Sequence, residues 1–365
     1  MGKDNGMSVD VKGELQGVVG DFSYEDFWSW FEQNAEHLYA VVKSEKNIAH
    51  DFIAPVTVQL NLLRDGFFLL AGMYSDDIAE MIITADGDVR VIPFIEELVA
   101  LAPEINNWRI TALKPPSERK DFEVNFSQGS LSAETLFFIH KENSKYPDLI
   151  DIEIVHHDIN DANRHLFEQG IFIFLENYIG ELASLEMIDY ISIKAAHEST
   201  GELIPLSKLS SFLNWRRKEF VGRNNSILCE SDNDAYVRIE TMTDNDEILI
   251  AAINRTLLQQ EHTTAYPWIA VVKILYGGDH GQPTLEDSLR LEGIEEYLSI
   301  LIDDDVEFLN IGKETGENIM EIYFACKGFR KPAIILDKLC QRGWIFEIDY
   351  QIFKDKYWQF FERFR

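Results

Sequence analysis

The sequence lacks the features of secreted, disulfide-linked and membrane-spanning proteins. Its 365 residues include only three cysteines, Cys229, Cys326 and Cys340, and none of them belongs to a CxxC pair. This pattern argues against a disulfide framework and against a zinc knuckle. The N-terminus has no apolar signal core, and the runs FFLLAGM and IFIFLENYIG are far too short to span a bilayer. We therefore expect a cytoplasmic protein with reduced thiols and no membrane segment.

Positive charge is also scarce. Lys and Arg number 33 against 63 Asp and Glu, which gives a formal net charge of −30. The densest basic run, Arg216 to Lys218, is too small for a nucleic-acid footprint, so we expect no binding to nucleic acid. An acidic exterior favours solubility and would complement a basic protein partner.

Known catalytic and nucleotide-binding motifs are missing as well. The sequence contains no dinucleotide fingerprint, P-loop, HExxH zinc motif, GxSxG nucleophile elbow or kinase-like set of motifs. These absences remove the direct arguments for an enzyme. We therefore assign no catalytic, cofactor-binding or metal-binding residue, and no cofactor.

One stretch nevertheless raises the question of a metal or acid/base site. The segment EIVHHDINDANRH, residues 153–165, holds three of the nine histidines and two aspartates. If its first residues form a strand, His156 and His157 point to opposite faces, because successive side chains alternate. The two adjacent histidines then cannot chelate one metal ion together.

The second part of this stretch has the features of a helix start. Asp158 or Asp161 is well placed to cap the helix that follows, since a carboxylate accepts hydrogen bonds from the unpaired N–H groups of a first turn. Asp161 and His165 are spaced to share a helix face. They supply only two ligands, whereas a catalytic zinc normally needs three. We predict a strand end and a helix cap.

The segment DGDVRVIPFIEE, residues 86–97, superficially resembles a calcium loop. Its loop position 5 is Arg90, and position 6 is Val91 where the sharp turn needs glycine. We predict a turn at Asp86-Gly87 followed by a helix.

Two further polar segments are candidates for ligand binding. The three aspartates of residues 303–305 could bind Mg²⁺ if other oxygens converged on them, but a solvated turn is the favoured interpretation. Asp279 and His280, in the Gly-rich segment 276–284, could act in acid/base chemistry. That segment has no P-loop lysine, so an ordinary loop is favoured.

The length exceeds the size at which one hydrophobic core usually stops growing, about 250 to 300 residues, so we expect more than one domain. The charged segment RRKEFVGRNNSILCESDND, residues 216–234, is the best candidate for a boundary. We predict a flexible N-terminus over residues 1–22, an N-terminal α+β domain over 23–222 and a C-terminal α+β domain over 228–365.

Hydrophobic periodicity predicts helices and strands in both domains. In the first domain we expect a helix that begins at Ser23, a helix over 48–63, and a series of strands interspersed with helices, including a long helix from Asp161 to Glu181. The sheets should be antiparallel or mixed and packed with helices. We expect the aromatic side chains around Trp28 and Trp358 to be buried against sheets.

The second domain shows a clearer order. WIAVVKIL, EFLNIG, IMEIYFAC and WIFEIDY are expected strands, KETGEN is an expected turn, and two amphipathic helices and a terminal aromatic helix complete the set. The order β-α-β-β-α-β predicts a ferredoxin-like C-terminal half.

The same segments carry a family resemblance. Residues 266–361 resemble the bacterial domain-of-unknown-function family numbered 695 in YPWIAVVKILY, LEDSLRLEGIEEYLSIL, EFLNIGKETGENIMEIYFAC and the closing Asp355, Tyr357, Trp358 and Phe361. The first half is similar to an uncharacterised bacterial group in FWSWFEQN, MIITADGDVRVIPFIEELVALAPEINNWRITALKPP and FLENYIGE. These are packing and turn residues, so the resemblance implies a fold and no catalytic residue.

Two functional hypotheses result. The first is a non-catalytic protein-interaction or regulatory module, such as an inhibitor or an immunity-type partner, whose acidic surface binds a basic protein. The alternative is a metal-assisted hydrolase that uses one of the Asp/His loops and needs at least three converging ligands. We adopt the first hypothesis, and the sequence leaves the oligomeric state open.

Overall fold

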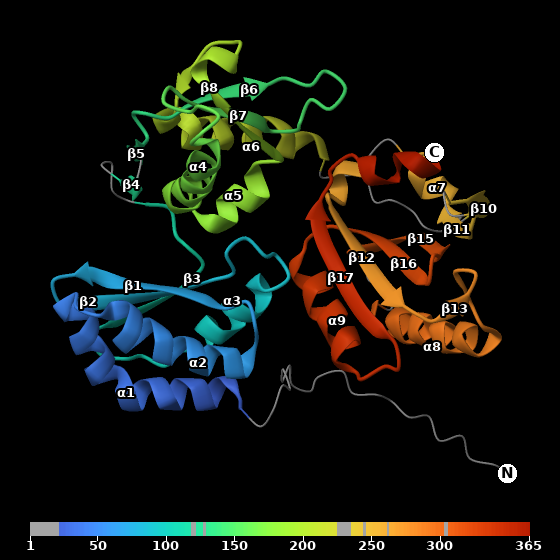
Figure 1. The fold of residues 1–365 in the computed structure, drawn as a ribbon, viewed down its shortest axis with the longest axis horizontal. Helices are drawn as coiled ribbons and strands as arrows, with labels where there is room; N and C mark the ends of the chain where they lie inside the picture. Colours follow the sequence, from blue (N-terminus) through green and yellow to red (C-terminus); the bar gives the residue numbers. More distant parts are fainter. Residues whose placement is uncertain are drawn as a thin grey trace. The chain divides into compact units, whose positions relative to one another are not determined.

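The computed structural model of the chain describes residues 22–117, 122–126, 129–224, 235–243, 246–260, 263–302 and 306–365 (Figure 1). The chain divides into two compact units, one with residues up to Ala85 and Ile95–Ala112, the other with Asp86–Phe94 and Leu113–Arg365. Helices and sheets occur throughout, which confirms the α+β class. The predicted domain limits at residues 222 and 228 stay a prediction, and residues 1–21 and Cys229 lie outside the described residues.

The first unit combines helices with a three-stranded sheet. Its sheet has the order β1-β2-β3, in which β1 and β2 are antiparallel and β2 and β3 are parallel. The elements follow the predicted order, and the segment predicted as one helix over 48–63 contains a π-helical turn followed by an α-helix. They are α1 (Tyr24–Ser44), η1 (Ala49–Ile53), α2 (Ala54–Leu63), β1 (Phe68–Ser75), β2 (Ile78–Thr84), α3 (Ile92–Ala100) and β3 (Trp108–Ala112).

Helix α1 begins where the sequence predicts. The Ser23 hydroxyl accepts a hydrogen bond from the backbone N–H of Asp26 at 3.2 Å, and the Asp26 carboxylate accepts from the N–H of Ser23 at 2.8 Å. This reciprocal capping box satisfies two backbone donors of the first turn. Phe27 and Phe31 are fully buried, and Trp28 donates its indole N–H to the Leu98 carbonyl at 2.9 Å. The predicted burial of this aromatic group is confirmed.

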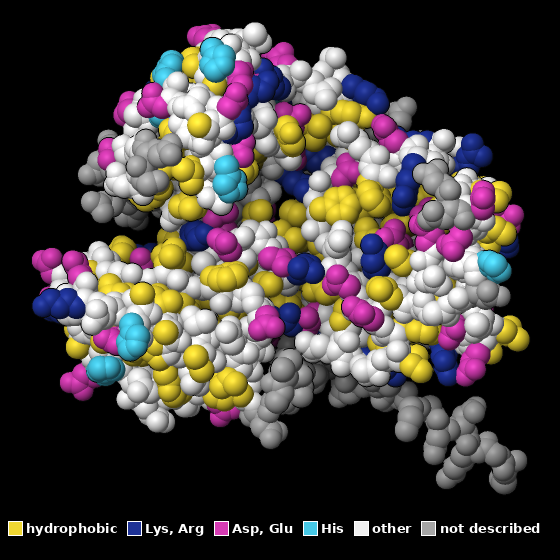
Figure 2. Space-filling view, viewed as in Figure 1, with side chains coloured by type: hydrophobic (Ala, Val, Ile, Leu, Met, Phe, Trp, Pro, Cys, Tyr) yellow, Lys and Arg dark blue, Asp and Glu magenta, His cyan; other side chains and the backbone are white. Residues whose placement is uncertain are grey.

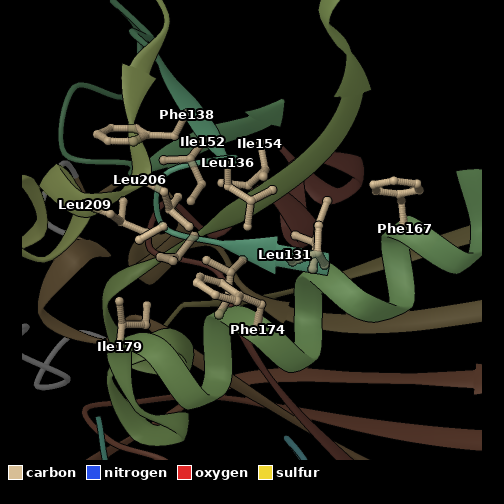
Figure 3. Close-up of a cluster of buried hydrophobic side chains, with 14 of the residues drawn as sticks. Leu131, Leu136, Phe138, Ile152, Ile154, Phe167, Phe174, Ile179, Leu206 and Leu209 are labelled. Carbon is tan, nitrogen blue, oxygen red and sulfur yellow. The ribbon is translucent and has the colours of Figure 1, made fainter. Parts of the chain in front are cut away.

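The second unit contains a four-stranded sheet of order β8-β7-β6-β9 and a small hairpin, β4-β5. Strands β7 and β8 are parallel, because α4 and α5 cross over between them, and β6 is antiparallel to β7. Figure 3 shows Ile152 and Ile154 of the sheet facing Phe167, Phe174 and Ile179 of α4 in one apolar core. The elements are β4 (Glu123–Phe126), β5 (Gly129–Ser132), β6 (Phe137–Lys141), β7 (Asp151–His156), α4 (Arg164–Ile179), α5 (Glu181–Met187), β8 (Tyr190–Ala195), η2 (Ala196–Glu198), β9 (Ile204–Pro205), η3 (Leu206–Lys208) and α6 (Leu209–Asn224).

One prediction for this part of the chain was wrong in detail. The helix predicted from Asp161 to Glu181 begins later and is interrupted at Gly180, whose φ is +92°. A Cβ at Gly180 would lie 3.0 Å from the Pro116 ring, so glycine makes this break possible. The charged stretch from residue 216 is helical as far as residue 224, because the apolar side chains Leu209 and Leu213 anchor α6 in the core.

The rest of the second unit forms a six-stranded antiparallel sheet of order β10-β11-β15-β16-β12-β17. Figure 1 shows α8 and α9 along one face of this sheet. Trp358 and Phe361 are fully buried in a cluster with Tyr323 of β16. The elements are β10 (Tyr236–Met242), β11 (Ile248–Asn254), α7 (Arg255–Leu258), η4 (Thr263–Ala265), β12 (Trp268–Leu275), β13 (Gly278–Asp279), β14 (Gln282–Pro283), α8 (Leu285–Ile302), β15 (Phe308–Gly316), β16 (Ile319–Cys326), α9 (Arg330–Gln341), β17 (Glu347–Lys354) and η5 (Gln359–Phe364).

The strands predicted here are present, with three local differences. Strand β17 begins at Glu347, three residues after the start of the predicted strand WIFEIDY. Strand β15 continues to Gly316, so the turn is the pair Glu317 and Asn318, both with positive φ, and not the whole of KETGEN. The terminal aromatic segment is a short 3-10 helix, η5. No helix among the described residues is long and apolar enough to cross a membrane.

Candidate functional site

The stretch with three histidines forms a strand end and a turn. His156 is buried and its ring lies 4.9 Å from that of Phe167, whereas the exposed His157 lies 5.6 Å from Phe137. The predicted alternation of the two histidines is therefore confirmed. His156 Nδ1 accepts a hydrogen bond from the backbone N–H of Asp158 at 3.1 Å, and burial lowers the pKa of His156.

The predicted helix cap was wrong. Helix α4 begins at Arg164, and the residue before it is Asn163, not Asp158 or Asp161. The Asn163 amide accepts from the N–H of Asn160 at 2.8 Å and donates to the Asp158 carbonyl at 2.9 Å. This asparagine-closed turn occupies residues that the sequence assigned to the helix, because amide side chains compete with the helix for backbone hydrogen bonds.

The buried charge of this stretch is Glu153, which the sequence analysis did not single out. Its side chain is 2% exposed on the central strand β7, and Lys141 of β6 and Lys194 of β8 lie 3.3 and 3.1 Å away. Burial raises the pKa of Glu153, but hydrogen bonds from Ser199 and the two lysines outweigh it and lower the pKa overall. The arrangement is a cross-strand ion-pair network.

The acidic segment at residues 86–97 has cations of the protein against its carboxylates. Asp86 lies 2.8 Å from the Lys114 ammonium group, and Asp88 pairs with Arg90 at 2.8 Å. Lys114 also contacts Glu176 at 2.7 Å. The predicted turn and helix are present, and the acidic side chains take part in ion pairs.

The other predicted candidates are Asp279, His280 and the three aspartates of residues 303–305. Asp279 belongs to a small hairpin, β13-β14, whose turn contains the exposed His280 at φ +52°. Residues 303–305 lie outside the described residues. In the part of the chain that the structure describes, no group of three or more His, Cys, Asp or Glu side chains could hold a metal ion.

A different feature of the second unit is chemically unusual for so acidic a chain. A pocket of about 520 Å³ is lined by six basic and only two acidic side chains, a formal excess of four positive charges. Figure 2 shows Asp and Glu side chains spread over the visible surface. The basic residues of the pocket are Arg216, Arg217, Lys327, Arg330, Lys354 and Lys356. We refer to this site as the basic pocket.

Asp189, which precedes β8, pairs with two of the lysines that line the basic pocket. Its carboxylate lies 2.8 Å from the ammonium group of Lys354 and 2.6 Å from that of Lys356. The same carboxylate accepts from the N–H of Ile150 at 2.7 Å, and its side chain is only 7% exposed. Two ammonium groups therefore share one carboxylate, which leaves a positive charge uncompensated by this aspartate.

Burial affects the ammonium group of Lys354, the last residue of β17. Burial lowers the pKa of Lys354, although Asp189 opposes this effect. Lys354 donates to the Glu186 carbonyl at 2.7 Å, and Lys356 donates to the Asp148 carbonyl at 3.0 Å. An anion that entered the pocket would stabilise the charged form of Lys354.

The remaining cations differ in how they are engaged. Arg330 lies 3.3 Å from Glu186, and Arg216 pairs with Glu219 at 3.4 Å and donates to the Leu149 carbonyl. Lys327 lies over the Tyr266 ring at 5.4 Å. Among the described residues, neither Lys327 nor Arg217 has a carboxylate partner.

Two buried aromatic residues contribute to the walls of the basic pocket. Trp268 and Phe329 are 7% and 1% exposed, and their ring centroids lie 4.9 Å apart in an edge-to-face arrangement. A pocket of this size, with apolar walls and a few converging charges, has the character of a small-molecule site. The arrangement can hold a small anion by charge-assisted hydrogen bonds.

The sequence by itself indicates only one part of this site. Arg216 and Arg217 belong to the basic run at residues 216–218, which by itself seemed an isolated island. The other four cations come from the ends of β16 and β17 and the start of α9. For the other four cations the sequence contains only a weak signal. Lys354 and Lys356 lie two positions apart, at the end of a segment rich in acidic residues.

Comparison with known proteins supports one part of the predicted resemblance. Residues 240–364 match the model of DUF695, a family of unknown function, which confirms the resemblance of the C-terminal half. The matched segment contains Lys327, Arg330, Lys354 and Lys356 of the basic pocket. The similarity predicted for the first half stays a prediction. No curated protein and no solved structure matches the chain.

Proposed function

We propose that this protein is a non-catalytic regulatory module that binds a small anion, bearing carboxylate or phosphate groups, in the basic pocket. The observation that supports it is the convergence of six basic side chains on one pocket in a chain of net charge −30. Charge-assisted hydrogen bonds to carboxylate or phosphate are about twice as strong as neutral ones. A bound anion would neutralise cations that the protein itself leaves in excess.

Regulation would follow from where the pocket residues lie. The cations belong to α6 and to elements of the six-stranded sheet, which are far apart in the sequence. A ligand that bridges them stabilises the folded arrangement that brings them together, by mass action on the native state. Ligand concentration would thereby set the stability of this part of the protein.

The test is ligand-dependent melting and calorimetric titration of the full chain. Citrate and inorganic phosphate serve as probes, with sodium chloride at equal ionic strength as the reference. We expect both probes to raise the melting temperature above the reference. The double variant Lys327→Gln/Arg217→Gln should bind roughly tenfold or more weakly, because a hydrogen bond to a charged group contributes about 1.5–3 kcal/mol.

A matched control separates pocket binding from general charge effects. Lys338→Gln removes one charge from an exposed position on α9 that does not line the pocket. This variant should bind the probes as the wild type does. An equal response of the wild type and the double variant, or no shift beyond that of chloride, would contradict the proposal.

A second candidate follows from the acidity of the chain. The net charge of −30, with acidic side chains spread over the face in Figure 2, favours docking of a basic protein, as an inhibitor or immunity-type partner would dock. Such binding should weaken as ionic strength rises and should be unaffected by the double variant in the basic pocket. An affinity that is the same at low and high salt would contradict it.

We further propose a ferredoxin-like fold for the C-terminal half, the domain limits predicted from the sequence, and a bacterial, cytoplasmic origin. The strand order β15-β16-β12-β17 with crossovers through α8 and α9 supports a ferredoxin-like C-terminal half. Cooperative folding of an isolated 228–365 chain would support the proposed domain limits. A bacterial, cytoplasmic origin without nucleic-acid binding agrees with the family resemblance and the charge.

Elemental analysis and melting with a chelator would test the metal-assisted hydrolase hypothesis.

A further inference from the structure

The strand β10 forms one edge of the six-stranded sheet. Within the described ranges it pairs only with β11, as Figure 1 shows at the outer end of the sheet. Tyr236 and Met242 at its two ends are 48% and 63% exposed, and Val237 is 36% exposed. An edge strand of this length presents backbone donors and acceptors to any strand that can align with it.

The hydrogen-bond pattern defines which residues of β10 face outward. Arg255 donates its N–H to the Ala235 carbonyl at 3.0 Å, and Thr243 donates to the Glu247 carbonyl at 2.8 Å, so the pairs at both ends of the ladder are hydrogen-bonded. In an antiparallel ladder, hydrogen-bonded and non-hydrogen-bonded pairs alternate. The odd-numbered residues of β10 therefore bond to β11. The even-numbered residues direct their N–H and C=O groups away from the sheet, and they are Tyr236, Arg238, Glu240 and Met242.

We propose that β10 pairs with β10 of a second copy of this chain, antiparallel and centred on Ile239. This register places Arg238 opposite the partner's Glu240 and Tyr236 opposite the partner's Met242. Arg238 and Glu240 then exchange backbone hydrogen bonds with the partner strand, and the two sheets become continuous. The interface is isologous, as in most homodimers.

Charge selects this register over its alternatives. Arg238 and Glu240 lie on the same face of β10, with Nε of Arg238 2.9 Å from Oε1 of Glu240. In the proposed register each arginine has a carboxylate directly across the interface as well, and opposite charges at such positions stabilise a sheet. A parallel pairing in register would place arginine beside arginine, and a shift by two residues would leave the charged pair unmatched. The sequence of the strand is therefore complementary to itself.

Charge complementarity also explains why the partner strand is β10 of a second copy and not a strand of unrelated sequence. Val237 and Ile239 supply apolar side chains on the other face of the strand, and in the proposed register Ile239 meets the partner's Ile239. A strand of unrelated sequence would share the backbone pattern but not the match of Arg238 with Glu240. The self-match is the feature that distinguishes a homodimer.

The experiment is the molar mass of the full chain, measured by light scattering after size exclusion and by native mass spectrometry over a dilution series. We expect the wild type to be dimeric and to dissociate on dilution. Arg238→Glu and Glu240→Arg each place like charges across the interface, so each should raise the dimer dissociation constant at least tenfold. The double variant Arg238→Glu/Glu240→Arg restores opposite charges and should restore dimerisation.

The same set of variants includes a control for correct folding. Arg238 and Glu240 have side chains 65% and 57% exposed, so the single variants should melt cooperatively as folded monomers. The charge-swapped double variant is expected to regain dimerisation, and misfolding could not produce such a gain. A wild type that is monomeric over the whole dilution series, or single variants that dimerise as the wild type does, would overturn the proposal.

Discussion

The ammonium group of Lys356 donates to Oδ2 of Asp189 at 2.6 Å, across 167 positions of the chain. The same carboxylate lies 2.8 Å from the ammonium group of Lys354. All three side chains are largely buried, with exposures of 17%, 7% and 11% for Lys356, Asp189 and Lys354. One carboxylate therefore pairs with two of the cations that line the basic pocket.

Replacing this carboxylate should strongly destabilise the protein. We expect Asp189→Asn to lower the free energy of unfolding by about 3 kcal/mol, because breaking a buried ion pair leaves an uncompensated charge inside the protein. Urea unfolding measures the effect. Asp161→Asn, at a fully exposed side chain, is the control and should change stability by less than about 0.5 kcal/mol. Equal stability of the two variants would show that Asp189 is not a structural anion.

Stability should decrease as the pH falls below the ordinary pKa of histidine, in part because of His156. Burial lowers the pKa of His156 below its usual value of 6.5, so the unfolded chain binds a proton more readily than the folded chain in this range. The free energy of unfolding should therefore fall between pH 6.5 and the pKa of the folded state. His156→Gln should reduce this slope, measured by urea unfolding at a series of pH values.

The neighbouring histidine provides the control for this experiment. His157→Gln changes an exposed side chain and should largely retain the wild-type slope. His140 retains a contribution in both variants, because burial and the nearby Arg216 lower the pKa of His140 as well. An identical pH dependence in the wild type and His156→Gln would contradict the prediction.

Glycine at position 312 should be indispensable for the pairing of β11 with β15. Gly312 has φ +142°, and a Cβ there would lie 2.2 Å from the Ala252 carbonyl oxygen. We expect Gly312→Ala to cost about 3 kcal/mol through overpacking and backbone strain. Gly343→Ala is the matched control, because Gly343 also has a positive φ, +76°, but nothing lies within 4 Å of its added Cβ. That variant should cost about 1 kcal/mol. Thermal melts of both variants would measure the difference.

The thiol of Cys340 should be unreactive in the folded protein at neutral pH. Burial, with help from Asp337 and Asp349, raises the pKa of Cys340 to about 12. Since the thiolate is the nucleophile, alkylation should be far slower in buffer than in urea. Mass spectrometry of the peptide that contains Cys340, after timed treatment with iodoacetamide, measures the rate. Rapid alkylation under native conditions would contradict the burial of this thiol.

Local patterns predicted much of the fold because they depend on neighbours in the sequence. The capping box of Ser23 and Asp26 and the alternation of His156 and His157 are both present as expected. The errors arose where tertiary packing or side-chain competition decided the outcome. Asn163 closes the turn before α4, and Gly180, packed against the Pro116 ring, interrupts the predicted long helix.

The sequence by itself determined the α+β class, the buried aromatic groups, the alternation of the strand residues and the excess of negative charge, because composition and periodicity depend only on the order of residues. Only the tertiary structure decided that the few cations converge. Arg216, Lys327 and Lys354 are distant in the chain and meet because the sheet and the helices place them around one pocket. Electrostatic energy depends on distance in space, so an acidic sequence can fold to contain a basic site.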